Sequence, residues 1–243
     1  MMKDICDLGI VCSHPRETRA IVSLLKDGKR ERFSLFIGYI GFLCGISCVI
    51  IESGMGRDRA YLAAKQTIPL FKPRVILDFG VAAGVNPALC PGTVFLAKKS
   101  VDLSEFMSIW EKRDPFFTST QHLPDKVDSE EIGVHSEILD QIVKSDDIKT
   151  GTAGSADFFL RSSLVRDELA RRAIDIFDYE TFSVLKAAVE SGIPALSVRG
   201  VSDSGRDNAQ EEFQTNLKKA IFRAADFLPS LCKNLKIQSK KFI

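Results

Sequence analysis

Short apolar runs alternate along this chain with longer segments in which apolar side chains recur every three or four residues. The runs have the length of β-strands, and the longer segments have the repeat of amphipathic helices. The expected strands include residues 7–12, 75–79, 91–97, 149–155 and 194–201, and the expected helices include residues 13–25, 61–71, 163–172, 181–191 and 210–228. Because strands that alternate with helices are typical of α/β proteins, we predict one α/β domain over residues 1–243, a twisted mixed β-sheet flanked by helices.

Local signals refine the N-terminal part of this prediction. Ser13 is a suitable N-cap for the first helix, and Pro15 is allowed in its first turn. Residues 32–37 and 41–51 are rich in strand-forming side chains, with glycines at the positions between them. We therefore expect a hairpin whose turn lies at residues 38–41.

Residues 101–134 show no dominant period, which predicts a long excursion that is partly loop. Its aromatic side chains either form a local core or cover a pocket. These side chains are Phe106, Trp110, Phe116 and Phe117. A further helix is expected at residues 137–143.

The stretch 174–207 places three carboxylates at the ends of two apolar strands joined by a helix. A strand–helix–strand unit of this length predicts parallel strands, and ligands bind at the C-terminal edge of such sheets. Asp178, Glu180 and Asp203 fall at this edge, where an unpaired carboxylate is costly. Asp178 and Glu180 also fit the start of a helix, and Asp203 followed by Ser-Gly also fits a turn. The structural and the functional interpretations both stay open at this point.

Composition narrows the classes of function. A formal net charge of +1 gives no support for nucleic acid as a partner, since that partner usually needs a clustered basic face. The six cysteines lack CxxC spacing, and the three histidines form no ligand-spaced cluster with them, so we expect no metal site. No stretch approaches the about 20 apolar residues of a membrane span, and the N-terminus lacks a signal-peptide pattern, so we expect a cytoplasmic protein.

Two glycine-containing segments, residues 53–57 (SGMGR) and 80–84 (GVAAG), are expected to be loops that present backbone N–H groups to a ligand. Neither matches the dinucleotide-binding or P-loop pattern. No GxSxG elbow is present either, which argues against a serine nucleophile. What remains is carboxylate chemistry, with Glu17, Glu180 and Asp203 each near the end of an expected strand.

Six segments follow one another along the chain in the order of a known family. They are GIVCSHPRETRAI, IIESGMGRDRA, VILDFGVAAGVNPALCPGTVFLA, SADFFL, DIFDYETFSVLKAA and SVRGVSDSG. The chain thereby resembles the nucleoside phosphorylase/nucleosidase superfamily, and is most similar to the methylthioadenosine/S-adenosylhomocysteine nucleosidases and their relatives. The resemblance covers most of the chain outside residues 101–149. It implies hydrolysis of an N-ribosyl bond without metal or organic cofactor, by a dimer or higher homo-oligomer.

The resemblance also implies roles for single residues. Asp203 falls at the general acid that protonates purine N7, Glu17 at the carboxylate that activates water, and Glu180 at the position that binds the ribose hydroxyls. The other substrate-binding positions are Tyr179 beside the sugar, Phe159 stacked on the base, Leu160 bound to the base through its backbone, and Asp178, Val81, Ala82 and Ser202. Cleavage of this bond needs two carboxyl groups in opposite protonation states, so we expect a protonated Asp203 and ionised Glu17 and Glu180.

Two residues depart from the nucleosidase pattern. Asp178 stands where the nucleosidases usually have glutamate, and Val81 stands where they have a small hydroxyl residue. The aromatic excursion at 106–117 lies where the resemblance fails. We expect it to make a larger apolar pocket for the 5′ substituent, which would suit futalosine-like or adenosyl-lipid substrates.

The nucleophile is the remaining question. Arg16 resembles an anion-binding arginine of the phosphorylases, and Arg57 and Arg199 are further candidates for phosphate ligands. We favour water because the carboxylate of Glu17 would repel phosphate. A phosphorylase on the same fold, and a nucleoside-binding module without catalysis, are the alternatives.

Overall fold

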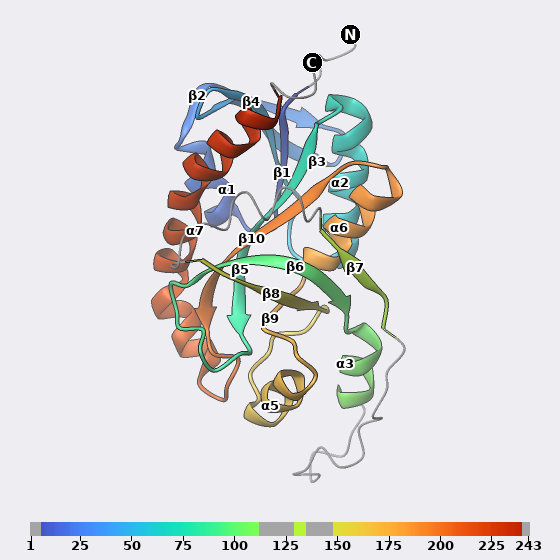
Figure 1. The fold of residues 1–243 in the computed structure, drawn as a ribbon, viewed down its shortest axis with the longest axis vertical. Coiled ribbons are helices and arrows are strands. Elements are labelled where there is room, and N and C mark those ends of the chain that lie inside the picture. Colours follow the sequence, from blue (N-terminus) through green and yellow to red (C-terminus); the bar gives the residue numbers. More distant parts are fainter. Residues whose placement is uncertain (1–5, 112–128, 135–147, 240–243) are drawn as a thin grey trace.

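The computed structural model describes residues 6–111, 129–134 and 148–239 (Figure 1). The expected helix at 137–143 and the side chains of Phe116 and Phe117 lie outside these residues. The strands are β1 (Leu8–Cys12), β2 (Leu25–Phe33), β3 (Phe36–Leu43), β4 (Ile46–Glu52), β5 (Val75–Gly84), β6 (Val94–Asp102), β7 (Glu131–Gly133), β8 (Ile148–Ser155), β9 (Ile176–Asp178) and β10 (Ala195–Asp203). The helices are α1 (Pro15–Val22), α2 (Arg57–Phe71), α3 (Ser104–Glu111), α5 (Ser163–Arg171), α6 (Thr181–Glu190) and α7 (Ala209–Ser239).

The strands form one mixed sheet, as predicted, in the order β10-β6-β8-β9-β5-β1-β4-β3-β2, with β7 beside β6. β10 also pairs with β5, so β10, β6, β8, β9 and β5 close into a ring. Strands β1, β4, β3 and β2 extend from β5, in this order, as an open sheet. β5 is therefore the strand that belongs to both the ring and the extension.

Helices cover both faces of the extended sheet. Ile10 of β1 packs on α7 residues such as Leu228, while its neighbour Val11 packs on the opposite face with Ala64 of α2 and Leu185 of α6. Successive side chains of a strand point to opposite faces, so one strand serves two cores. Figure 1 shows α7 and α1 on one side and α2 and α6 on the other. Among the described residues, no helix is long and apolar enough to cross a membrane.

The prediction of parallel strands around residues 174–207 is wrong. β10 runs parallel to β5, whereas β9 runs antiparallel to it. The closed ring explains the difference, because chain direction must reverse an even number of times around it. The reversals lie at β10–β6 and at β9–β5.

The predicted hairpin turn at 38–41 is also wrong, since β3 runs through both glycines. The turns lie at residues 34–35 and 44–45, where Ser34, Cys44 and Gly45 have φ of 52°, 50° and 79°. Gly38 is needed for close packing instead: a Cβ there would lie 2.6 Å from the Phe33 ring and 2.7 Å from Ile51 Cδ1. These glycines therefore indicate a closely packed strand and not a turn.

Two further expectations are corrected at the start of α1 and the end of β5. The N-cap of α1 is His14, not Ser13: its Nδ1 accepts a hydrogen bond from the Arg16 amide, while the Glu17 carboxylate accepts one from the His14 amide. Pro15 is in the first turn, as predicted. Residues 80–84 are not a loop but the last part of β5.

Candidate functional site

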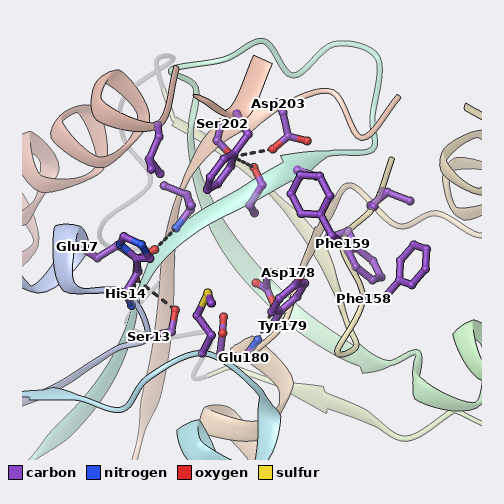
Figure 2. Close-up of a pocket in the computed structure, with 18 of the residues that line it drawn as sticks. Ser13, His14, Glu17, Phe158, Phe159, Asp178, Tyr179, Glu180, Ser202 and Asp203 are labelled. Atoms are coloured by element: carbon purple, nitrogen blue, oxygen red, sulfur yellow. Dashed lines mark hydrogen bonds between the residues drawn. The ribbon is translucent and has the colours of Figure 1, made fainter. Parts of the chain in front are cut away.

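A cavity of about 310 Å³ opens where β5, β9 and β10 end (Figure 2). Phe177 of β9 and Asp203 of β10 both pair with Ala83 of β5, from opposite sides. This register brings two carboxylate-bearing strand ends to one place although the strands run in opposite directions. Ten residues that the sequence analysis selected line the cavity: Glu17, Val81, Ala82, Phe159, Leu160, Asp178, Tyr179, Glu180, Ser202 and Asp203.

Asp203 is buried at one end of this cavity, the upper end in Figure 2. Its Oδ2 accepts a hydrogen bond from Ser202 Oγ at 2.8 Å, and its Oδ1 accepts one from the Gly205 amide at 3.0 Å. Burial raises the pKa of Asp203 to about 6, against the two hydrogen bonds, which favour the charged form. Asp203 is thus a carboxyl group that can carry a proton near neutral pH.

Glu17 is buried on another wall, at the left of Figure 2. Its Oε1 accepts a hydrogen bond from the Val81 amide at 3.0 Å, and its Oε2 accepts one from the His14 amide at 2.9 Å. Burial raises the pKa of Glu17, while Arg199 and the two amides lower it. The Val81 backbone therefore supplies a polar contact, although its side chain cannot.

Arg199 lies fully buried behind the cavity, where it forms ion pairs with Asp78, Asp178 and Glu180. Its charge also lowers the pKa of Glu17. Its Nη2 donates to both carboxylate oxygens of Asp78 at 2.7 Å, and its Nε lies 3.2 Å from Asp178. Its Nη1 lies 3.9 Å from Glu180. A cation surrounded in this way stabilises the ionised carboxylates of a site that is otherwise dry.

Asp178 is buried and serves mainly the local structure. Its Oδ1 accepts hydrogen bonds from the Glu180 and Thr181 amides at 3.1 and 3.0 Å, where α6 begins. Ser155 Oγ donates to the same oxygen at 2.7 Å. The helix-opening interpretation of Asp178 is supported by these contacts, because they use amide donors that have no partner within the helix.

Glu180 lies buried at the lower side of Figure 2, where the Gly56 amide donates to its Oε1 at 3.1 Å. Burial, followed by the charges of Asp178 and Glu17, raises the pKa of Glu180 to about 8 despite Arg199. A pKa of about 8 favours the protonated carboxyl group of Glu180 at pH 7, whereas the sequence analysis expects the ionised form.

Aromatic side chains form the wall between these acids. Phe159 meets Phe213 of α7 edge to face, with ring centroids 5.9 Å apart. Burial raises the pKa of the Tyr179 hydroxyl to about 12. Phe106 does not belong to this wall: it is buried in α3, under the guanidinium of Arg172, whose Cζ lies 4.9 Å from the ring centroid. For Phe106, the local-core interpretation is correct.

The three candidate phosphate ligands do not line the cavity. Arg16 is exposed on α1, and Arg57 forms an ion pair with Asp102 at 2.5 Å. Arg199 is occupied by its carboxylate partners. Within the described part of the chain, no group of histidine, cysteine and acidic side chains could hold a metal ion.

Sequence reasoning missed several lining residues. They are Ser13, His14, Met55, Ala83, Phe158, Phe177, Gln210, Phe213 and Leu217. The last three lie on one face of α7, and their spacing of three and four residues was a signal for a shared face. Whether this face lines the cavity depends on how α7 packs against the sheet, and the sequence alone does not predict that packing.

Gly80 is where the backbone of β5 passes closest to the buried charges. A Cβ at this position would lie 2.3 Å from Arg199 Nη1 and 2.7 Å from Glu17 Oε1. We expect Gly80→Ala to lower the free energy of unfolding by about 1–3 kcal/mol, the usual cost of overpacking. Urea unfolding measures this, with Gly133→Ala as the control, since no atom of the described residues lies within 4 Å of its added Cβ. Equal stability of Gly80→Ala and the wild type would contradict the packing described here.

Comparison with known proteins identifies the family. The sequence profile of the phosphorylase superfamily matches residues 7–233. The chain belongs to this superfamily.

Its relatives include nucleosidases of several bacteria. The chain is 24% identical over 241 residues to the 5′-methylthioadenosine/S-adenosylhomocysteine nucleosidase of Buchnera aphidicola, which covers 96% of this chain and 98% of that protein. It is 25% identical over 227 residues to the enzyme of that name from Mycobacterium bovis, covering 83% and 87% of the two chains.

Solved structures share the fold. The futalosine hydrolase of Helicobacter pylori superposes with a TM-score of 0.79 at 20% identity, over 96% of this chain and 98% of the other. The 5′-methylthioadenosine/S-adenosylhomocysteine nucleosidase of Neisseria meningitidis, in complex with methylthio-immucillin-A, superposes with a TM-score of 0.78 at 19% identity, over 94% and 99%.

Proposed function

We propose that this protein is an N-ribosyl hydrolase that cleaves the glycosidic bond of a 5′-substituted purine nucleoside. One observation carries the proposal: Asp203 and Glu17 are two buried carboxyl groups on different walls of one cavity, and among the described residues only Glu17 has a cation, Arg199, that favours its ionised form. The names of the nucleosidase and futalosine hydrolase relatives support the same class of reaction.

In this proposal Asp203 gives its proton to N7 of the purine, which lets the base leave as a neutral molecule. The bond between N9 and C1′ breaks, and the electron pair stays with the base. Glu17 accepts a proton from the water that attacks C1′, and the sugar leaves with a new hydroxyl group. General acid and general base each contribute about 10²–10⁴-fold to such reactions.

The other lining residues bind the substrate. Phe159 and Phe213 offer aromatic surface to the base, and the Leu160 backbone offers polar groups to it. Tyr179 lies along the sugar, and Glu180 accepts hydrogen bonds from the ribose hydroxyls. Binding of those hydroxyls favours the ionised form of Glu180, because a carboxylate accepts two hydrogen bonds more strongly than a neutral acid does.

Val81, Ala82 and Ser202 complete the substrate-binding set. Val81 and Ala82 contribute β5 backbone and apolar surface, and Ser202 orients Asp203 by its hydrogen bond. Hydrolysis is favoured over phosphorolysis because Arg16, Arg57 and Arg199 lie outside the cavity lining.

A homo-oligomer, such as a dimer, fits the exposure of one lining residue. Met55 lines the cavity, yet 61% of its surface is exposed. A second copy that covered Met55 would close this side of the site. Cys6, Cys12, Cys48 and Cys90 are free thiols in the described part of the chain, which fits a reducing cytoplasm.

Release of the free base tests the proposed function. We would incubate the purified protein with a panel of 5′-substituted adenosines and inosines, and separate base from nucleoside by chromatography. Cleavage of at least one member supports the proposal. Tight binding without base release from any member would instead identify a nucleoside-binding module.

The pH dependence follows from the acid that must be protonated. Because Asp203, with a pKa of about 6, must be protonated and Glu180, with a pKa of about 8, must be ionised when the substrate binds, we expect kcat/KM to change little between about pH 6 and 8. Above about pH 8 it should fall, approaching about tenfold per pH unit, as the proton of Asp203 is lost. The fall below about pH 6 reports protonation of Glu180 and Glu17. Rates measured across this range check the sign: a rate that rises steadily to high pH would contradict an acid role for Asp203.

A further inference from the structure

His14 is a polar residue of the cavity lining to which the proposed reaction gives no role. Its backbone amide donates to Glu17 Oε2 at 2.9 Å, so the residue lies beside the carboxylate assigned to the attacking water. Figure 2 shows the imidazole next to Glu17 and away from Asp203. His14 therefore lies at the sugar end of the cavity, while Asp203 marks the base end.

The imidazole of His14, a residue that lines this cavity, carries a hydrogen-bond donor. Its Nδ1 accepts a hydrogen bond from the Arg16 amide at 3.1 Å, and an accepting nitrogen carries no proton. The proton of the neutral ring is then on Nε2. Burial and the charges of Arg16 and Arg19 lower the pKa of His14, while the charge of Glu52 raises it. The net lowering favours a neutral imidazole at pH 7. Within the described residues, Nε2 donates no hydrogen bond.

The polar atoms of a ribosyl group limit what this donor can bind. The proposed function assigns the 2′ and 3′ hydroxyls to Glu180. A donor directed at the ribose ring oxygen would oppose the positive charge that the ribose ring acquires in an oxocarbenium-like transition state. The atom that remains at the sugar end is the one attached to C5′.

We propose that His14 donates a hydrogen bond from Nε2 to an oxygen on C5′, so that the protein selects 5′-oxygen nucleosides over 5′-thioether nucleosides. A thioether sulfur is a weak acceptor, whereas a hydroxyl, ether or ester oxygen is a good one. This inference rests on the proposed nucleoside site and names the chemical class of its 5′ substituent.

Two substitutions separate the donor from the helix cap that His14 also forms. His14→Asn keeps an acceptor near the Nδ1 position, so it can still cap α1, but it has no donor where Nε2 lies. His14→Gln places an amide donor near the Nε2 position and gives up the cap. His14→Asn tests whether the Nε2 donor recognises the ligand. His14→Gln tests whether another donor restores this recognition although the helix cap is lost.

The experiment compares adenosine with 5′-deoxyadenosine and 5′-methylthioadenosine, by kcat/KM and by calorimetric dissociation constants. For the wild type and His14→Gln, we expect adenosine to be preferred over 5′-deoxyadenosine by about three- to tenfold, the value of one neutral hydrogen bond. For His14→Asn we expect no preference between adenosine and 5′-deoxyadenosine.

A preference that persists in His14→Asn would overturn the inference, as would equal affinities in the wild type or no binding of any of the three. The affinity ratio is independent of turnover. If the wild type binds the nucleosides with the expected preference but releases no base, the proposed function fails and the role of His14 stands.

Discussion

Asp203→Asn is expected to lower kcat by about 10²–10⁴-fold while the dissociation constant of the substrate changes little. Asparagine has nearly the shape of aspartic acid and can keep the contacts with Ser202 and Gly205, but it has no proton to transfer. The loss should therefore fall on the transition state alone. Single-turnover rates and calorimetric binding, measured on the same preparation, separate the two effects.

Asp226→Asn is the matched control, since Asp226 is exposed on α7, away from the cavity. We expect wild-type rates for it. If Asp203→Asn kept more than about a tenth of the wild-type kcat, the proton would come from another group and the assignment of the general acid would be wrong.

Glu17→Gln should have the second large effect, a fall in kcat of about 10²–10⁴-fold, because an amide cannot accept the proton of the attacking water. It should also lower the free energy of unfolding by about 1–3 kcal/mol. The amides of Val81 and His14 both donate to Glu17, and a glutamine side chain presents one donor of its own to them. Initial rates and urea unfolding measure the two effects.

Glu211→Gln serves as the control for this substitution, because Glu211 is exposed in the first turn of α7. It should match the wild type in both measurements. A Glu17→Gln variant that still folded and released base at the wild-type rate would show that the nucleophile needs no help from Glu17.

The alternation of apolar runs and helical repeats predicted the α/β class because each signal is local. Strand direction around residues 174–207 was not predictable in this way. β9 is only three residues long, and its direction is set by closure of the ring through β6 and β8. Those strands lie far from β9 in the sequence.

Glycines led to a wrong prediction from the sequence at two places, and the physical reason is the same at both. Gly38 and Gly80 read as turn or loop residues, yet both lie inside strands. They are glycine because side chains from other elements occupy the space of a Cβ. A single sequence does not distinguish a glycine needed for backbone conformation from one needed for close approach.

The acidic residues of the site were found in the sequence because carboxylates at strand ends are unusual and fit a known family pattern. The residues contributed by α7, such as Phe213, were missed because helix periodicity does not say which neighbour a helix face meets. The shared charge of Arg199 was missed as well. The carboxyl groups around it come from α1, β5 and the junction of β9 and α6, and burial together with the charges of Asp178 and Glu17 raises the pKa of Glu180 to about 8.

The most direct test of the account is to identify the sugar product in heavy-oxygen water, with and without phosphate. Mass spectrometry of the product gives the answer. The account predicts a free sugar that carries one heavy oxygen and is formed at the same rate in both buffers. A sugar 1-phosphate formed only when phosphate is present would contradict hydrolysis, and would direct attention to Arg16, Arg57 and Arg199.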